Sequence, residues 1–210
     1  MSRIQECKTK LLFPTPVFTG VVKDVRGLNH ELRDLILHLK DHSGDDVHRQ
    51  SNVAGWQSQR DFLARQDPPI ERLNPILNEA VHTFMRSITD AGESLEVGLT
   101  ESWANVLYSG AYNTPHEHGD SMLSGVYYVD VGESLAGDTR SGQFSFIDRG
   151  RITSQLGPLA LKLSHSYAPM EPADGLILLF PGQLMHYVHP YQGDTPRIAI
   201  AFNMNLRKPG

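Results

Sequence analysis

Four residues with metal-binding side chains stand out because of their spacing. His116, His118 and Asp120 occupy alternate positions, so an extended backbone would point all three side chains the same way. His186 follows an apolar stretch much later in the chain and supplies a distant partner. Two imidazoles and one carboxylate that leave coordination positions open suit non-haem iron(II) and oxygen. The spacing therefore predicts a candidate iron site.

The combination and order of these residues carry the prediction, because single histidines are weak indicators. The chain has ten histidines, and most histidines are surface or hydrogen-bonded residues. His189 lies three positions after His186, so strand alternation would place the two on opposite faces. We therefore expect His189 at the rim of the site, and Glu117 pointing away from it.

The segment 197–206 is predicted to be a strand with two different faces. One face is bulky and apolar, and it comprises Ile198, Ile200, Phe202, Met204 and Leu206. The other face is small and polar, and it comprises Arg197, Ala199, Ala201, Asn203 and Asn205. Room beside one fixed charge is what the lining of a ligand cavity needs. A solvent-facing side with an exposed arginine is the alternative, and this strand alone leaves both open.

The elements that must position these residues change character near residue 95. Beyond it, short alternating stretches are separated by Gly, Pro, Asp and Ser. They predict strands near 95–99, 102–108, 124–130, 143–147, 160–168, 175–180 and 197–206. Many short strands indicate a sandwich or a barrel. We expect one mainly β domain with helices (α+β) over residues 1–210, with the barrel core at about 95–207 and the helices packed outside.

The first part, about residues 1–94, is predicted to hold helices and an edge strand. The stretch 11–18 contains prolines, which edge strands tolerate. Asn29 is predicted to cap a helix. Its apolar stripe comprises Leu32, Leu35, Ile36 and Leu39. A second helix is predicted near Asn74, which would cap it, and Pro75, which fits a first turn. Its stripe comprises Leu77, Val81, Phe84 and Ile88.

Composition narrows the classes of partner and location. The net charge is -5 over 210 residues and the basic residues are dispersed, which disfavours general nucleic-acid binding and anionic membranes. No stretch approaches the ~20 apolar residues of a membrane span. Cys7 is the one cysteine, so no internal disulfide can form. We expect a cytoplasmic protein, and a homodimer is possible.

The order of motifs in the second half resembles the 2-oxoglutarate/iron(II) oxygenase superfamily, which includes the prolyl hydroxylases. The matching elements are Tyr108, Gly110, His116 onward, Tyr127-Tyr128, Phe180-Pro181, His186, Val188, Pro190, Gly193 and Arg197. More narrowly, four segments are similar to a group of uncharacterised bacterial and phage proteins of that superfamily. They are Trp56-Gln57-Ser58, Trp103-Ala104-Asn105, His116-Glu117-His118 and Ser124-Gly125-Val126-Tyr127-Tyr128. The narrower resemblance covers most of the chain.

The resemblance implies a double-stranded β-helix (jelly-roll, cupin-like) barrel and an oxidative reaction. Iron(II) and the cosubstrate 2-oxoglutarate would hydroxylate a substrate that the sequence does not identify. His116 and His186 would bind iron, with no catalytic side chain beyond the metal ligands. Arg197 would pair with the distal carboxylate of 2-oxoglutarate, since its guanidinium forms a two-pronged match to a carboxylate.

Further cosubstrate roles follow from the same resemblance. Tyr128 would donate a hydrogen bond to the same carboxylate, and parity then predicts that Tyr127 points to the opposite side. Tyr108 would reach the other end of the cosubstrate. Asn105 and Asn203 are weaker candidates for the same cavity, and Trp103 is expected to serve packing.

The chain departs from the family pattern at the carboxylate ligand. Its expected position, two residues after His116, is His118. Three ligand sets are open: His116, His118 and His186; His118 and Asp120 with His186; or His116 and Asp120 with His118 beside the metal. The alignment favours the first set, and Asp120 is the alternative to one of its first two members.

Two rival functions remain at this stage. A three-histidine barrel could be a cupin-type dioxygenase that binds its substrate without 2-oxoglutarate, or a metal-binding barrel with no catalytic activity. Arg197 distinguishes a 2-oxoglutarate oxygenase from the cupin-type dioxygenase, because it has a clear role only where a ligand carries a carboxylate.

Overall fold

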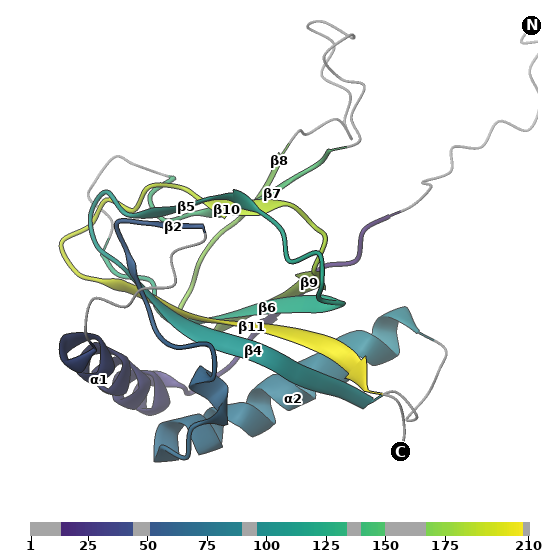
Figure 1. The fold of residues 1–210 in the computed structure, drawn as a ribbon, viewed down its shortest axis with the longest axis horizontal. Helices are drawn as coiled ribbons and strands as arrows, with labels where there is room; N and C mark the ends of the chain where they lie inside the picture. The colour runs from purple at the N-terminus through teal and green to yellow at the C-terminus, as the bar shows by residue number, and fades with distance from the viewer. Residues whose placement is uncertain (1–13, 44–50, 90–95, 134–139, 150–166, 208–210) are drawn as a thin grey trace, which may run out of the picture.

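The computed structural model describes residues 14–43, 51–89, 96–133, 140–149 and 167–207. Two antiparallel sheets face each other, and both α-helices found in these ranges cover the outer face of the larger sheet (Figure 1). The predicted class, a jelly-roll barrel with helices packed outside, is confirmed. None of the helices in these ranges is both long and apolar enough to span a bilayer.

The larger sheet has the strand order β1-β9-β6-β11-β4-β3. Its strands are β1 (Phe18–Val21), β3 (Trp56–Gln57), β4 (Glu96–Leu107), β6 (Leu123–Asp130), β9 (Leu176–Pro181) and β11 (Arg197–Arg207). The smaller sheet has the order β2-β5-β10-β7-β8. Its strands are β2 (Asn52–Val53), β5 (Tyr112–His116), β7 (Phe144–Ile147), β8 (Tyr167–Met170) and β10 (His186–Val188).

The two faces of the larger sheet belong to two hydrophobic clusters. On β11, Ile198, Ile200 and Phe202 pack with the helices, whereas Ala199 belongs to the cluster between the sheets. On β6, Tyr127 packs with the helices and Tyr128 between the sheets, as parity predicted. The period of two therefore separates residues that hold the helices from residues that face the barrel interior.

Strand β4 switches its faces at one residue. Its ladder with β11 pairs Asn203 with Glu101 and Met204 with Leu99, so Thr100 is an extra residue in β4, a β-bulge. After the bulge Trp103 lines the cavity between the sheets, whereas before it Leu99 packs against the hydrophobic cluster that includes the helices. The two strands predicted at 95–99 and 102–108 are therefore one bulged strand.

Both predicted helix starts were wrong. Helix α1 covers Arg26–His42, and Asn29 lies inside it. The Asn29 amide donates to the Val129 carbonyl (2.8 Å) and accepts from the Tyr127 hydroxyl (2.6 Å), so a tertiary contact uses the group that the sequence suggested as a cap.

Helix α2 covers Pro68–Ile88, begins after Asp67 and contains Pro75 in its interior. Pro68 and Pro69 take the first-turn positions, where a missing N–H is not needed. Asn74 donates to the Leu63 carbonyl (3.0 Å) at the short 3-10 helix η1 (Phe62–Ala64).

The remaining boundaries shift by a few residues. The edge strand predicted at 11–18 was wrong for residues 14–17, which form no strand; the edge strand β1 begins only at Phe18, and residues 11–13 lie outside the described ranges. The strand predicted at 160–168 lies mostly outside them, and β8 begins at Tyr167. The strands predicted at 124–130, 143–147, 175–180 and 197–206 correspond to β6, β7, β9 and β11.

Candidate metal centre

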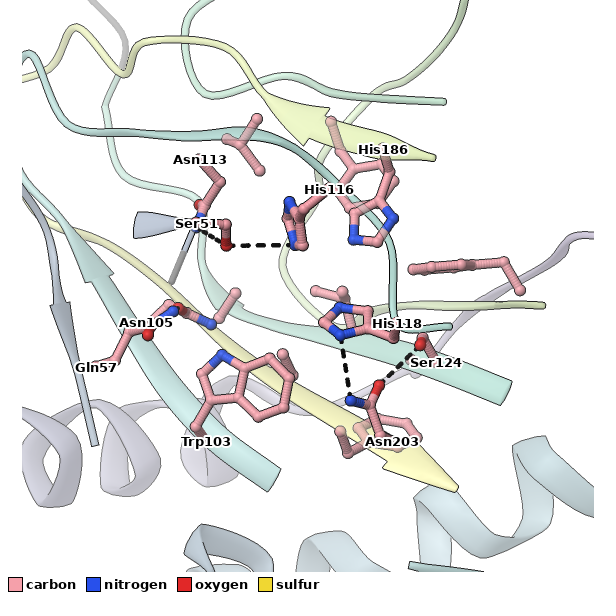
Figure 2. A pocket seen from close by; sticks show the side chains of 18 of the residues that line it. Ser51, Gln57, Trp103, Asn105, Asn113, His116, His118, Ser124, His186 and Asn203 are labelled. Carbon is pink, nitrogen blue, oxygen red and sulfur yellow. Dashed lines mark hydrogen bonds between the residues drawn. The ribbon is translucent and has the colours of Figure 1, made fainter. Parts of the chain in front are cut away.

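A cavity of about 540 Å³, including its open mouth, lies between the two sheets. Both sheets contribute polar and aromatic lining residues, and the smaller sheet also contributes His116 and His186 (Figure 2). The principal polar and aromatic lining residues are Ser51, Gln57, Trp103, Asn105, Asn113, His116, His118, Ser124, Phe144, Phe180, His186, Arg197 and Asn203.

Three histidines meet at one end of this cavity. His116 ends β5 and His186 begins β10, and the two are direct cross-strand partners. His118 follows two residues after His116, and one ring nitrogen of each histidine lies within 4.8 Å of the other two. Within the described ranges, no other group of three or more His, Cys, Asp or Glu side chains converges in this way. A metal ion could therefore be held by imidazoles from two strands and the loop between β5 and β6.

Backbone contacts place His118 beside the other two. Its amide N–H donates to the Gly182 carbonyl (2.7 Å), and the Gly182 N–H donates to the Met122 carbonyl (3.1 Å). A Cβ at Gly182 would lie 2.1 Å from the Ser121 carbonyl oxygen, so only glycine permits this close approach. The Pro-Gly turn after β9 thus holds the loop that carries His118.

Two of the rings are oriented by backbone carbonyls. His116 Nδ1 lies 2.7 Å from the Thr114 carbonyl oxygen, and His186 Nδ1 lies 2.8 Å from that of Leu184. A carbonyl only accepts, so each Nδ1 carries the proton and each Nε2 keeps a lone pair. Histidine ligands of metals are commonly oriented in this way.

All three rings are neutral at pH 7. Burial, followed by the charge of His116, lowers the pKa of His186 to about 3 and that of His118 to about 4. Burial also lowers the pKa of His116. A neutral imidazole keeps a lone pair on one ring nitrogen, which is the form that binds a metal ion.

Asp120 is not brought into this cluster. The chain turns after His118, with the Ser121 N–H donating to the His118 carbonyl (2.9 Å), and Asp120 is exposed. The expectation that 116, 118 and 120 share one extended face therefore fails at Asp120, because β5 ends at His116. Glu117 points away as expected and pairs with Arg149 (2.9 Å).

His189 also lies apart from the three-histidine group, as strand alternation predicted. Its Nε2 is 3.4 Å from the Ser145 hydroxyl, and its ring packs on Tyr187.

The other end of the cavity holds a buried cation. Arg197 is 3% exposed and Tyr128 is fully buried, with the guanidinium carbon 5.1 Å from the centre of the Tyr128 ring. Arg197 Nε and the Tyr128 hydroxyl are both buried without a hydrogen-bond partner in the described part of the chain. Burial raises the pKa of Tyr128, and the neighbouring Arg197 side chain opposes this only in part, so the hydroxyl stays protonated and can donate.

The weaker candidates have different fates. Asn105 lines the cavity and accepts a hydrogen bond from Gln57 Nε2 (2.8 Å), and Asn203 lines it beside His118. Tyr108 does not line the cavity: it follows the end of β4, is 43% exposed and lies 5.6 Å from the Lys40 ammonium. Trp103 was expected to serve packing, and it forms part of the cavity wall near His118.

Several lining residues were not predicted, and two of them come from short segments near the histidines and Asn105. The Ser51 hydroxyl lies 3.4 Å from His116 Nε2, and Gln57 borders the cavity with its Oε1 unpartnered among the described residues. They flank or belong to β2 and β3, strands of two residues that have no detectable period. The quoted Trp56-Gln57-Ser58 motif was the one available signal for Gln57.

Residues 101–203 match the model of a protein family described as "putative 2OG-Fe(II) oxygenase". This region belongs to the 2-oxoglutarate/iron(II) oxygenase superfamily. The match spans all three histidines and Arg197, so both ends of the cavity lie within the oxygenase region. A comparison with curated protein sequences gave no match.

Solved oxygenase structures share the fold at low sequence identity. A prolyl-4-hydroxylase from Pseudomonas putida is 13% identical, with a TM-score of 0.65 over 93% of this chain and 94% of its own. HygX from Streptomyces hygroscopicus, with nickel and 2-oxoglutarate bound, is 12% identical, with a TM-score of 0.61 over 91% of this chain and 83% of its own. A Trichoplax adhaerens prolyl hydroxylase in complex with a hypoxia-inducible-factor peptide fragment is 13% identical, with a TM-score of 0.59 over 90% of this chain and 82% of its own.

Proposed function

We propose that His116, His118 and His186 hold iron(II) in this oxygenase and that Arg197 and Tyr128 bind the distal carboxylate of 2-oxoglutarate. The observation that carries the proposal is the buried charge of Arg197. In the described ranges no carboxylate pairs with it, although a buried cation without a partner is strongly destabilising. A carboxylate from a ligand would supply the missing partner.

The residues present fit both groups. Neutral imidazoles on two strands and a loop suit iron(II), and the arginine fork with a protonated tyrosine suits a carboxylate. Both ends line one cavity, and Ala199 and Ala201 on β11 leave room along its wall. A dicarboxylate with a keto group could therefore reach the metal and the arginine together.

The chain's own residues would bind, orient and exclude water. Iron, when bound with 2-oxoglutarate, would supply the oxygen activation that the reaction needs. Arg197 and Tyr128 would fix one end of the cosubstrate so that its keto group points toward the histidines. Phe144, Phe180 and Val188 form an apolar wall near His186 and would limit water at the reacting end.

The substrate is proposed only as a class. Ser51, Gln57 and Asn113 give the cavity a neutral polar side, which suits an uncharged group with hydrogen-bonding atoms. The similarity to peptide-bound and small-molecule-bound oxygenases supports a peptide or a small metabolite. We also propose a cytoplasmic location, because a chain with a single cysteine has no internal disulfide to suit an oxidising compartment. We further propose that the chain forms one domain, which can associate as a homodimer.

One observation favours a second function. His118 stands where the superfamily pattern has a carboxylate, and a three-histidine site also suits a cupin-type dioxygenase that does not use 2-oxoglutarate. Such an enzyme would need no anion at Arg197. The two functions therefore differ in whether 2-oxoglutarate binds the loaded metal.

The decisive experiment is an anaerobic titration of the iron(II)-loaded protein with 2-oxoglutarate. Chelation by a keto acid gives a visible charge-transfer band, whereas succinate, which has no keto group, is the matched control and should give none. Appearance of the band with 2-oxoglutarate alone would support the proposal. Iron binding without a band would reject the cosubstrate roles of Arg197 and Tyr128 and favour the cupin-type function.

A further inference from the structure

The side-chain amide of Asn203 connects His118 to a carboxylate outside the ligand set. Asn203 is 1% exposed and accepts from the Ser124 hydroxyl at Oδ1 (2.7 Å). Its Nδ2 donates to Glu101 Oε1 (2.6 Å) and lies 3.3 Å from His118 Nδ1 (Figure 2 shows the contacts with Ser124 and His118). The β-bulge at Thr100 makes this possible, because it pairs Glu101 with Asn203 across β4 and β11.

The direction of these bonds determines where His118 carries its proton. An amide nitrogen only donates and a carboxylate only accepts, so Glu101 keeps Nδ2 on the side of His118. The Nδ1 atom of His118 must then accept. A neutral ring has one N–H, so in this arrangement the proton sits on Nε2. Figure 2 shows that this other ring nitrogen faces His116 and His186.

His118 therefore differs from its two neighbours. His116 and His186 donate from Nδ1 to carbonyls and present an Nε2 lone pair to the cluster. His118 presents an N–H to the cluster, which cannot bind a metal ion. If Asn203 turned its amide by half a turn, Oδ1 would accept from His118 Nδ1–H and Nδ2 would donate to the Ser124 hydroxyl, which can also accept.

We propose that Asn203 is a positioning residue with two amide orientations, and that Glu101 holds the one that keeps His118 out of the metal site. The inference rests on the proposed role of His118 as a ligand. On metal binding the amide turns, and the ring exchanges its Nε2 proton for one on Nδ1 through water, without net proton release. Glu101 then turns to Arg60, whose guanidinium nitrogen is 3.6 Å from Oε2 and which lies over Trp103.

The test uses ¹⁵N-histidine NMR on the metal-free full-length protein. The wild type should show His118 protonated at Nε2, and Glu101→Gln should shift the proton to Nδ1. The reason is that the new side-chain amide can donate to Asn203 Oδ1 and so permit the turned orientation. Glu101 is 37% exposed, so the variant should fold.

Metal affinity provides the second readout. Anaerobic titration with cobalt(II) should show about tenfold tighter binding in Glu101→Gln, within the range known for residues behind a ligand. If Glu101 acted only as a nearby negative charge, the same change would weaken binding, so the sign decides. Glu117→Gln is the matched control, because it removes an equal charge beside the cluster without touching Asn203.

Three outcomes would overturn the inference: an Nδ1 proton on His118 in the metal-free wild type, an unchanged tautomer in Glu101→Gln, or the same affinity change in Glu101→Gln and Glu117→Gln. Failure of the proposed function would look different. No variant would then bind cobalt(II), while NMR would still decide the orientation of the Asn203 amide.

Discussion

The two ends of the cavity differ in the charge of the partner that each could bind. The histidine end has three neutral rings with lowered pKa values, of which those of His116 and His118 are half-buried and that of His186 is buried. The arginine end has a permanent charge buried to 3% exposure beside a hydroxyl with no partner in the described ranges. One end lacks a cation and the other lacks an anion. A metal ion chelated by a dicarboxylate would supply the cation at the histidines and the anion at Arg197. Neither end alone indicates this combination.

The two ends also differ in how much they cost the stability of the ligand-free fold. Lone pairs that face a cavity cost little when water can reach them, whereas a buried guanidinium without an anion is a continuing cost to the fold. The arginine end therefore indicates a ligand more strongly than the histidine end does. Variants at each end should change one kind of binding and leave the other.

The largest effect is expected at the histidine end. His186→Ala removes one of three ligands, at roughly 3 kcal/mol for each ligand, and should weaken cobalt(II) or iron(II) binding more than about 100-fold. Anaerobic calorimetry would measure this. His189→Ala is the matched control, because His189 lies outside the cluster near Ser145. A change of less than about fivefold for His186→Ala would show that the ring is not a ligand.

At the arginine end, Arg197→Gln should weaken 2-oxoglutarate binding by about 100-fold, on the basis of two charge-assisted hydrogen bonds. Metal affinity should stay within about twofold. The ligand-free variant should also melt at a higher temperature, because an unpaired buried charge has been removed. A lower melting temperature together with wild-type 2-oxoglutarate affinity would contradict both claims.

A smaller effect should appear in the pH dependence of the metal-free protein. The unfolded chain binds protons at histidines near pH 6.5, whereas folded His118 and His186 do so only near pH 4 and 3. Stability is therefore greatest above pH 6.5 and decreases as the pH falls below it, by about 3 kcal/mol for the two rings together by pH 5.5. Urea unfolding at several pH values would measure it. In the His118→Gln/His186→Gln double variant, the free energy of unfolding should depend less on pH. A pH dependence equal to that of the wild type would show that the two rings are not held neutral in the folded protein.

The smallest effect is expected from Asp120→Asn. Asp120 is exposed beyond the turn at His118, so metal affinity should change by less than about twofold, as for an exposed charge near a site. Calorimetry with cobalt(II) would again measure it. A loss comparable to that of His186→Ala would restore Asp120 to the ligand set and reject His118 or His116.

Periodic patterns correctly predicted which face of a long strand each side chain lies on. Alternation placed Arg197 on the interior face of β11 and separated Tyr127 from Tyr128, because each strand is long enough to show its period. The helix caps at Asn29 and Asn74 failed because both amides make contacts with residues distant along the chain or outside the helix.

Local sequence could not predict the contacts around the histidines in the same way. Ser51 approaches His116 from a segment with no regular pattern. The link from Glu101 to Asn203 depends on the one-residue bulge in β4 and on a partner 102 positions away. Such contacts follow from the register between strands, which composition and spacing within one strand do not determine.

The bulge at Thr100 also has a consequence for how this chain can evolve. Because it reverses the parity of β4, Val97 and Leu99 serve helix packing, while Trp103 and Asn105 line the cavity and Glu101 contacts the lining residue Asn203. Substitutions on either side of Thr100 can therefore be selected almost independently, one set for folding and the other for the shape of the cavity. Loss of the single residue Thr100 would couple the two sets again, since any restored pairing would turn one of them to the wrong face.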